Sequence, residues 1–213
     1  MQSPFKKIAQ AIFEFFIITF LALLPTLSVY IDVIVLGNDL GEISVTEIAQ
    51  EALLLASAFI FWYGAWKKPN MRGFLVLIAS FFSCLFIREM DSFLDEIRHG
   101  FWFWPALVTA LVSIVYARWL AKSTTLKPLV SFINTKPYFL ILIGLIILII
   151  LSRTFGSGNL FWNYLLPDGG AFLAKTVVQE GLELFGYAFI FYGALVFHYR
   201  NYVSFLSTAP SQD

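Results

Sequence analysis

The chain has 213 residues, of which 59% are hydrophobic and only 13% are charged, and its mean hydropathy is +0.79. These values lie outside the usual range of soluble domains and predict an integral membrane protein. The formal net charge of zero gives no basic surface for nucleic acid, and the single Cys84 excludes a disulfide framework or a thiolate metal cluster.

Six apolar segments are long enough to cross about 30 Å of hydrocarbon as helices. They comprise residues 11–35, 47–66, 73–90, 101–120, 137–153 and 176–198. Lipid cannot satisfy unpaired backbone groups and no alternating strands are visible, so each segment is predicted to be a helix. The sequence therefore predicts an all-α, polytopic integral membrane protein with one transmembrane domain, residues 1–213.

The basic residues predict the orientation of these helices. If the helices alternate in direction, ten of the fourteen Lys and Arg residues lie on the side of the N-terminus. The exceptions are Arg88, Arg98, Arg153 and Lys175. The positive-inside rule then places both termini in the cytoplasm (N-in/C-in), and we expect a multi-pass protein of a bacterial inner membrane.

The acidic residues have the opposite distribution, which the positive-inside rule does not require because it is nearly indifferent to acids. Twelve of the fourteen lie at outer helix ends or in outer loops: Asp32, Asp39, Glu42, Glu47, Glu51, Glu89, Asp91, Asp95, Glu96, Asp168, Glu180 and Glu183. We expect an acid-rich cavity that opens to the outer, periplasmic face.

The second and sixth predicted helices resemble each other. A shift of 129 residues aligns Gln50 and Glu51 with Gln179 and Glu180, and it aligns the Tyr-Gly-Ala sequence at 63–65 with that at 192–194. Both helices run from outside to inside, so the pattern predicts a parallel internal repeat rather than an inverted one. The alternative is a chance similarity between two apolar segments.

The densest polar run, residues 88–99, lies at the outer end of the third helix. If it remains helical, one charged stripe forms on its surface and pairs internally. The stripe comprises Arg88, Asp91, Asp95 and Arg98 or His99. Glu89 points away from this stripe, so we expect it to need a partner on another helix, such as Arg153.

The outer loop at 154–174 mixes glycines with Phe161, Trp162 and Tyr164. This composition predicts a segment that lies in the membrane interface or folds back over the helix ends. A lid over the cavity is the alternative.

Carboxylates that share a low-dielectric site repel each other when ionised, which favours uptake of a proton or a cation. The leading hypothesis is therefore a protein that binds or translocates a proton or a small cation. The predicted binding residues are Gln50, Glu51, Arg88, Glu89, Asp91, Arg153, Gln179, Glu180 and Glu183.

Two other classes of function stay open. The first is a membrane-embedded hydrolase or transferase that acts on a lipid head group with a carboxylate-bound divalent metal ion. Its predicted metal ligands are Glu51, Glu89, His99 and Glu180, although no HExxH, HxxxH or cysteine spacing accompanies them. The second is a non-catalytic subunit, sensor or immunity-type protein. The expected partners are membrane lipid, a proton or cation, and a second copy of the chain or another protein.

Overall fold

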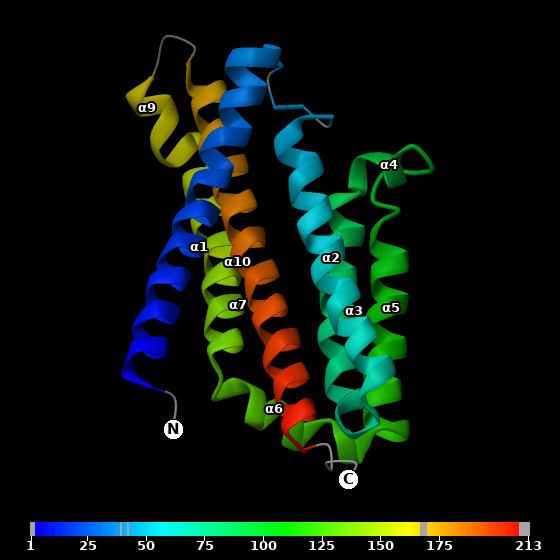
Figure 1. The fold of residues 1–213 in the computed structure, drawn as a ribbon. Coiled ribbons are helices and arrows are strands. Elements are labelled where there is room, and N and C mark those ends of the chain that lie inside the picture. Colours follow the sequence, from blue (N-terminus) through cyan, green and yellow to red (C-terminus); the bar gives the residue numbers. More distant parts are fainter. Residues whose placement is uncertain (1–2, 39, 42, 167–169, 209–213) are drawn as a thin grey trace. The chain divides into compact units, whose positions relative to one another are not determined.

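The computed structural model describes residues 3–38, 40–41, 43–166 and 170–208, and for residues 200–208 it describes the backbone only. Within these ranges every regular element is a helix (Figure 1). Three of the predicted outer acids, Asp39, Glu42 and Asp168, lie outside the described residues, as does part of the loop at 154–174.

Among the described residues, six helices are long and apolar enough to cross a membrane, which confirms the six predicted segments. They span Pro4–Leu36, Val45–Lys67, Pro69–Glu89, Phe103–Leu120, Lys136–Phe155 and Ala171–Tyr199. The largest differences from prediction are at the first and last helices, which begin earlier. The first begins at Pro4 because the Ser3 side chain accepts a hydrogen bond from the Lys6 backbone N–H at 3.4 Å, and proline suits the first helical position.

The long helices are built from α-helices that π-helical turns extend in three places. In chain order the elements are α1 Pro4–Tyr30, η1 Ile31–Leu36, α2 Val45–Lys67, η2 Pro69–Met71, α3 Arg72–Glu89, α4 Asp91–Asp95, α5 Phe103–Val115, η3 Tyr116–Leu120, η4 Lys122–Thr124, α6 Leu126–Ile133, α7 Lys136–Ile146, η5 Ile147–Leu151, α8 Ser152–Phe155, η6 Gly158–Trp162, α9 Asn163–Leu165 and α10 Ala171–Thr208.

Contacts between residues divide the chain into two compact units. Unit 1 comprises Met1–Ala49 and Ile146–Ala188, and unit 2 comprises Gln50–Leu145 and Phe189–Asp213. Helices α2 and α10 each begin in unit 1 and end in unit 2. The single domain expected from the sequence stays a prediction.

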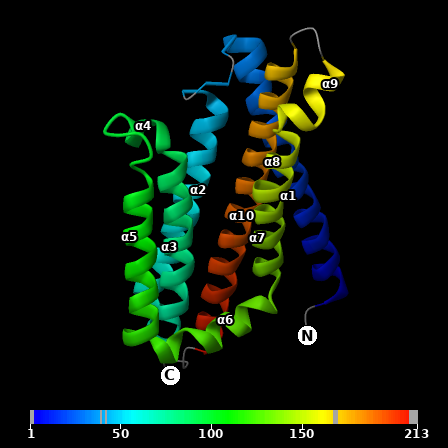
Figure 2. The same cartoon turned by 180° about the vertical axis from the view of Figure 1, so that it is seen from behind.

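In unit 1, η6 contacts both α8 and α9, which is labelled near α8 in Figure 2. The Trp162 indole N–H donates a hydrogen bond to the Phe155 carbonyl at 2.6 Å, and the rings of Phe155 and Phe161 stack with their centroids 5.6 Å apart. These aromatic side chains hold the segment 158–162 against the end of α8. The described part of the outer loop is therefore largely helical and folds back on its own unit.

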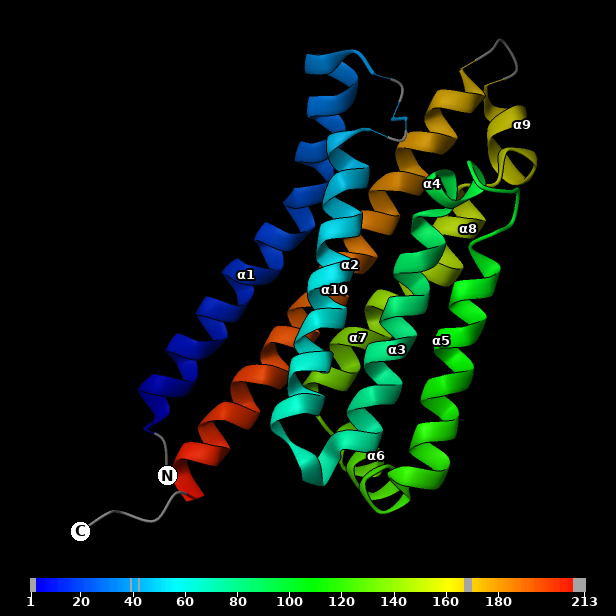
Figure 3. The same cartoon turned by 90° about the vertical axis from the view of Figure 1, so that its right-hand side faces the viewer.

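In unit 2, α3 packs along α5, and the two run side by side in Figure 3. Phenylalanine side chains form the core of this unit. Phe61 contacts Phe82 and Phe197, with ring centroids 5.6 and 5.3 Å away, and Phe132 contacts Phe74 and Phe197 at 5.2 and 5.5 Å. Burial of such large rings stabilises the unit.

Candidate functional site: buried carboxylates in each unit

The polar run after α3 does not remain helical. The helix ends at Glu89, and Met90 takes a non-helical conformation with φ −82° and ψ 21° before the short α4 begins. The continuous charged stripe therefore does not form. The last predicted pair of the stripe, Asp95 with His99, is nevertheless present. Asp95 accepts hydrogen bonds from His99 Nδ1 and from the Gly100 backbone N–H, both at 2.8 Å.

Glu89 pairs with its neighbour in sequence. Arg88 Nη2 donates to Glu89 Oε1 at 2.6 Å, and the Glu89 side chain is only 13% exposed. Glu89 therefore has a partner on its own helix, and the expected partner on another helix, such as Arg153, stays a prediction.

Glu51 lies two turns into α2 and is half-buried. Among the residues that the structure describes, it forms no hydrogen bond or ion pair, and the charge that acts on it most directly is that of Glu89. The charges of two carboxylates of unit 2 therefore act on each other, and Glu89 pairs with Arg88 whereas Glu51 pairs with no cation in the described part of the chain. Such a pair attracts a positive ion or a proton.

Glu183 is the most buried acidic residue of the predicted set, at 3% exposed. In unit 1, Gln179 Nε2 donates to Glu183 Oε1 at 3.2 Å, and Arg153 Nη2 lies 3.7 Å from the same oxygen. Gly156 makes room for this group, since a Cβ there would collide with the Gln179 side chain. Glu180 is half-buried one residue from Gln179.

The predicted site residues are thus divided between the two units. Gln50, Glu51, Arg88, Glu89, Asp91 and His99 belong to unit 2, whereas Arg153, Gln179, Glu180 and Glu183 belong to unit 1. Within each unit the structure brings some of them together. One shared cavity for the whole set stays a prediction.

The predicted metal ligands have different surroundings. His99 has a side chain that is 99% exposed and is bonded to Asp95. In the described part of the chain, no three or more His, Cys, Asp and Glu side chains form a group that could hold a metal ion. The set Glu51, Glu89, His99 and Glu180, which draws on both units, therefore gains no support from the geometry within either unit.

Asp32 is a structural carboxylate that the sequence marked only as an outer acid. It is completely buried in unit 1, and its two oxygens accept hydrogen bonds from the backbone N–H groups of Val45 and Thr46, both at 2.8 Å. The Thr46 hydroxyl at 2.6 Å and the Asn38 amide at 3.2 Å complete its surroundings. Asp32 therefore ties the end of the first span to the first turn of α2 and has no capacity left for a ligand.

The buried acids accordingly fall into two kinds. Asp32 is saturated by donors that include the first turn of α2, whereas the charge of Glu89 acts on Glu51 and Arg88 pairs with Glu89. Comparison of the chain with protein-family models, with curated proteins and with solved structures finds no match.

Proposed function

We propose that the protein is a multi-pass protein of a bacterial inner membrane that binds or translocates a proton or a small cation. The observation that carries the proposal is the half-buried carboxylate of Glu51, which has Glu89 as its charged neighbour and no cation paired with it in the described part of the chain. A carboxylate in such surroundings is costly when ionised and becomes favourable when a positive charge is taken up.

The surroundings of Glu51 favour a small ligand of low charge. Arg88 lies 2.6 Å from Glu89, whereas no cation in the described part of the chain is paired with Glu51. A single proton or a monovalent ion is enough to neutralise the Glu51 carboxylate. The proposal therefore favours a proton or a monovalent cation over the divalent metal that a hydrolase or transferase would need.

Glu180 and Glu183 of unit 1 supply the second group of carboxylates in this proposal. Glu180 corresponds to Glu51 in the proposed parallel repeat, and Glu183 has Gln179 and Arg153 beside it. With both termini in the cytoplasm, both groups lie toward the periplasmic end of their helices, where an ion enters from the outside.

The proposal is tested by thermal unfolding of the purified protein in detergent over a range of pH and of Na⁺ or K⁺ concentration. An ion that binds only the folded state raises its stability by about 2.7 kcal/mol at a hundredfold excess over Kd. For a chain of this size, that corresponds to a rise of roughly 5–10 °C in Tm.

The decisive variant is the double substitution Glu51→Gln and Glu89→Gln, which keeps the shape of both side chains and removes both charges. It is expected to lose the part of the response to pH and ions that Glu51 and Glu89 contribute, while Glu180 and Glu183 are unchanged. Glu96→Gln is the matched control, because Glu96 is an exposed acid of the same outer segment. An undiminished response in the double variant would overturn the role proposed for Glu51 and Glu89.

A further inference from the structure

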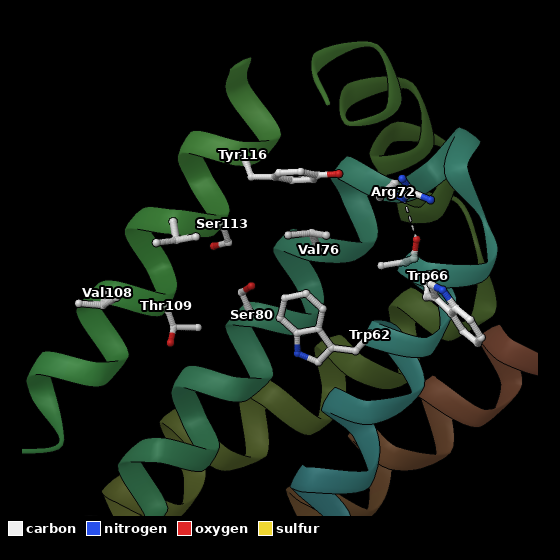
Figure 4. Close-up of a pocket in the computed structure, with 11 residues that line it drawn as sticks. Trp62, Trp66, Arg72, Val76, Ser80, Val108, Thr109, Ser113 and Tyr116 are labelled. Atoms are coloured by element: carbon white, nitrogen blue, oxygen red, sulfur yellow. Dashed lines mark hydrogen bonds between the residues drawn. The ribbon is translucent and has the colours of Figure 1, made fainter. Parts of the chain in front are cut away.

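A pocket of about 670 Å³ lies within unit 2, between α2, α3 and the helix formed by α5 and η3 (Figure 4). Its walls are apolar: Val76 comes from α3, Val108 and Val112 come from α5, and the indole of Trp62 comes from α2. No acidic residue lines it. Its volume lies within the range of small-molecule sites, and it shares no residue with the carboxylate group proposed above.

One end of the pocket is positively charged. Arg72, the first residue of α3, donates from Nε to the Ala65 carbonyl at 3.1 Å, and the Tyr116 side chain extends toward it in Figure 4. No carboxylate in the described ranges pairs with Arg72. Its terminal nitrogens therefore keep donors for a ligand, and the planar guanidinium suits a carboxylate or phosphate.

Two further cations follow the pocket residue Trp66 in the sequence. Lys67 Nζ lies over the ring of Trp66, 4.2 Å from its centroid, and Lys68 follows. With Trp66 lining the same pocket, this region has the aromatic and basic residues that anchor anionic lipid groups at a membrane interface. The charged end therefore selects an anion.

A second polar position lies deeper in the pocket. Ser80 is only 2% exposed, yet its hydroxyl oxygen has no hydrogen-bond partner among the described residues. The hydroxyl groups of Ser80 and Ser113 both project into the space between α3 and α5 (Figure 4). Ser113 differs because it already donates to the Ala110 carbonyl at 2.9 Å.

A buried hydroxyl without a partner costs about 1–3 kcal/mol, so a polar atom is expected next to Ser80 when the pocket is filled. Ser80 lies eight positions after Arg72 in the helix, which corresponds to about 12 Å along α3. The ligand must therefore carry an anionic group and a hydrogen-bonding group that are separated by an apolar stretch of about this length.

We propose that this pocket binds a single-chain lipid anion that carries a hydrogen-bonding group, such as a hydroxyl, in the middle of its chain. The anionic group lies at Arg72, the chain passes between Val76 and Val112, and the mid-chain group bonds to the hydroxyl of Ser80. Val112 is 62% exposed, so the pocket is open on the α5 side and the chain can enter directly from the surrounding lipid.

The test compares two probes that differ by one oxygen atom, octadecanoate and its mid-chain hydroxy derivative. Their binding to the purified protein in nanodiscs of a zwitterionic lipid is measured by quenching of tryptophan fluorescence. The wild-type protein is expected to bind the hydroxy derivative about fivefold more tightly, the factor that one net hydrogen bond of about 1 kcal/mol supplies.

Ser80→Ala is expected to abolish this preference and to leave the affinity for octadecanoate within about twofold, since one hydrogen bond is all that it removes. Ser57→Ala is the matched control, because Ser57 is a completely buried serine of the same unit whose hydroxyl donates to the Leu53 carbonyl. It is expected to keep the preference.

Arg72→Gln is expected to weaken binding of both probes by about tenfold or more, as a lost charge-assisted hydrogen bond does. Arg72→Lys keeps the positive charge and serves as a control for a folding defect. Its affinity for both probes is expected to lie between that of the wild-type protein and that of Arg72→Gln. Equal affinity of the wild-type protein for the two probes would overturn the proposal. So would a preference that survives Ser80→Ala, or tighter binding of a two-chain phospholipid than of either probe.

Discussion

Replacement of Asp32 by alanine is expected to destabilise unit 1 strongly, because this buried carboxylate holds the start of α2. The backbone N–H groups of Val45 and Thr46 belong to the first turn of α2, where no carbonyl of the same helix can accept from them. Asp32 accepts from both at 2.8 Å and from the Thr46 hydroxyl at 2.6 Å. Alanine leaves all three donors buried without an acceptor.

The size of the effect follows from these contacts. Loss of a helix cap costs about 0.5–2 kcal/mol, and each hydrogen bond to a charged group contributes about 1.5–3 kcal/mol. Because the donors share one acceptor group, the separate values do not add in full, and we expect a loss of about 3–5 kcal/mol for Asp32→Ala. Asp32→Asn keeps the shape and one acceptor oxygen, and we expect about half of this loss.

The assay is unfolding of the purified protein in mixed micelles with increasing SDS, combined with hydrogen exchange of the first amides of α2. Glu96→Ala is the control, because this exposed acid is expected to change stability by less than about 0.5 kcal/mol. If Asp32→Ala costs no more than Glu96→Ala, or if the amides of Val45 and Thr46 exchange no faster in the variant, the structural role assigned to Asp32 is refuted.

Three further predictions use the same unfolding assay. A Cβ at Gly193 would lie 2.7 Å from the Ile141 side chain, so Gly193→Ala is expected to destabilise the protein by about 1–3 kcal/mol. A Cβ at Gly64 would lie 3.5 Å from its nearest neighbour, so Gly64→Ala is expected to be neutral or slightly stabilising. Equal effects of the two substitutions would contradict this prediction. Arg153→Gln removes a cation 3.7 Å from the buried Glu183 and is expected to lower stability by about 1 kcal/mol. An unchanged stability would show that the ion pair does not stabilise the protein. Burial lowers the pKa of Lys68, so between that value and its ordinary value near 10.5 the unfolded chain binds more protons; stability is expected to rise with pH there, and Lys68→Met should flatten the rise.

The six spans could be predicted because apolar length alone identifies them, and the start of the first helix could have been read from Ser3 and Pro4. The end of α3 could not, because methionine is a good helix former and does not mark a helix end. The pairing of Glu89 with Arg88 depends on side-chain conformation, which the sequence does not give.

The roles of individual polar residues could not be predicted, because they depend on which side chains are buried. In helices that are apolar on every face, the periodicity of the sequence does not indicate the buried side. Asp32 serves as a cap because the chain turns back after Gly37, whose φ of 64° ends the π-helical turn, and returns with Val45 beside it. Ser80 and Ser83 look equivalent in the sequence, yet Ser83 bonds to the Ala79 carbonyl and to Trp62, whereas Ser80 opens into the pocket.

The central claim is that Glu51 and Glu89 exchange protons for cations, and the most direct measurement is proton release from the purified protein. Na⁺ or K⁺ is added in weakly buffered detergent solution near neutral pH, and a pH-sensitive dye reports the protons set free. If one proton is shared by the two carboxylates, the wild-type protein releases up to about one proton per chain. The Glu51→Gln, Glu89→Gln double variant releases clearly fewer protons, since only Glu180 and Glu183 remain, and Glu96→Gln behaves like the wild type. Equal release from the wild-type protein and the double variant would contradict the account.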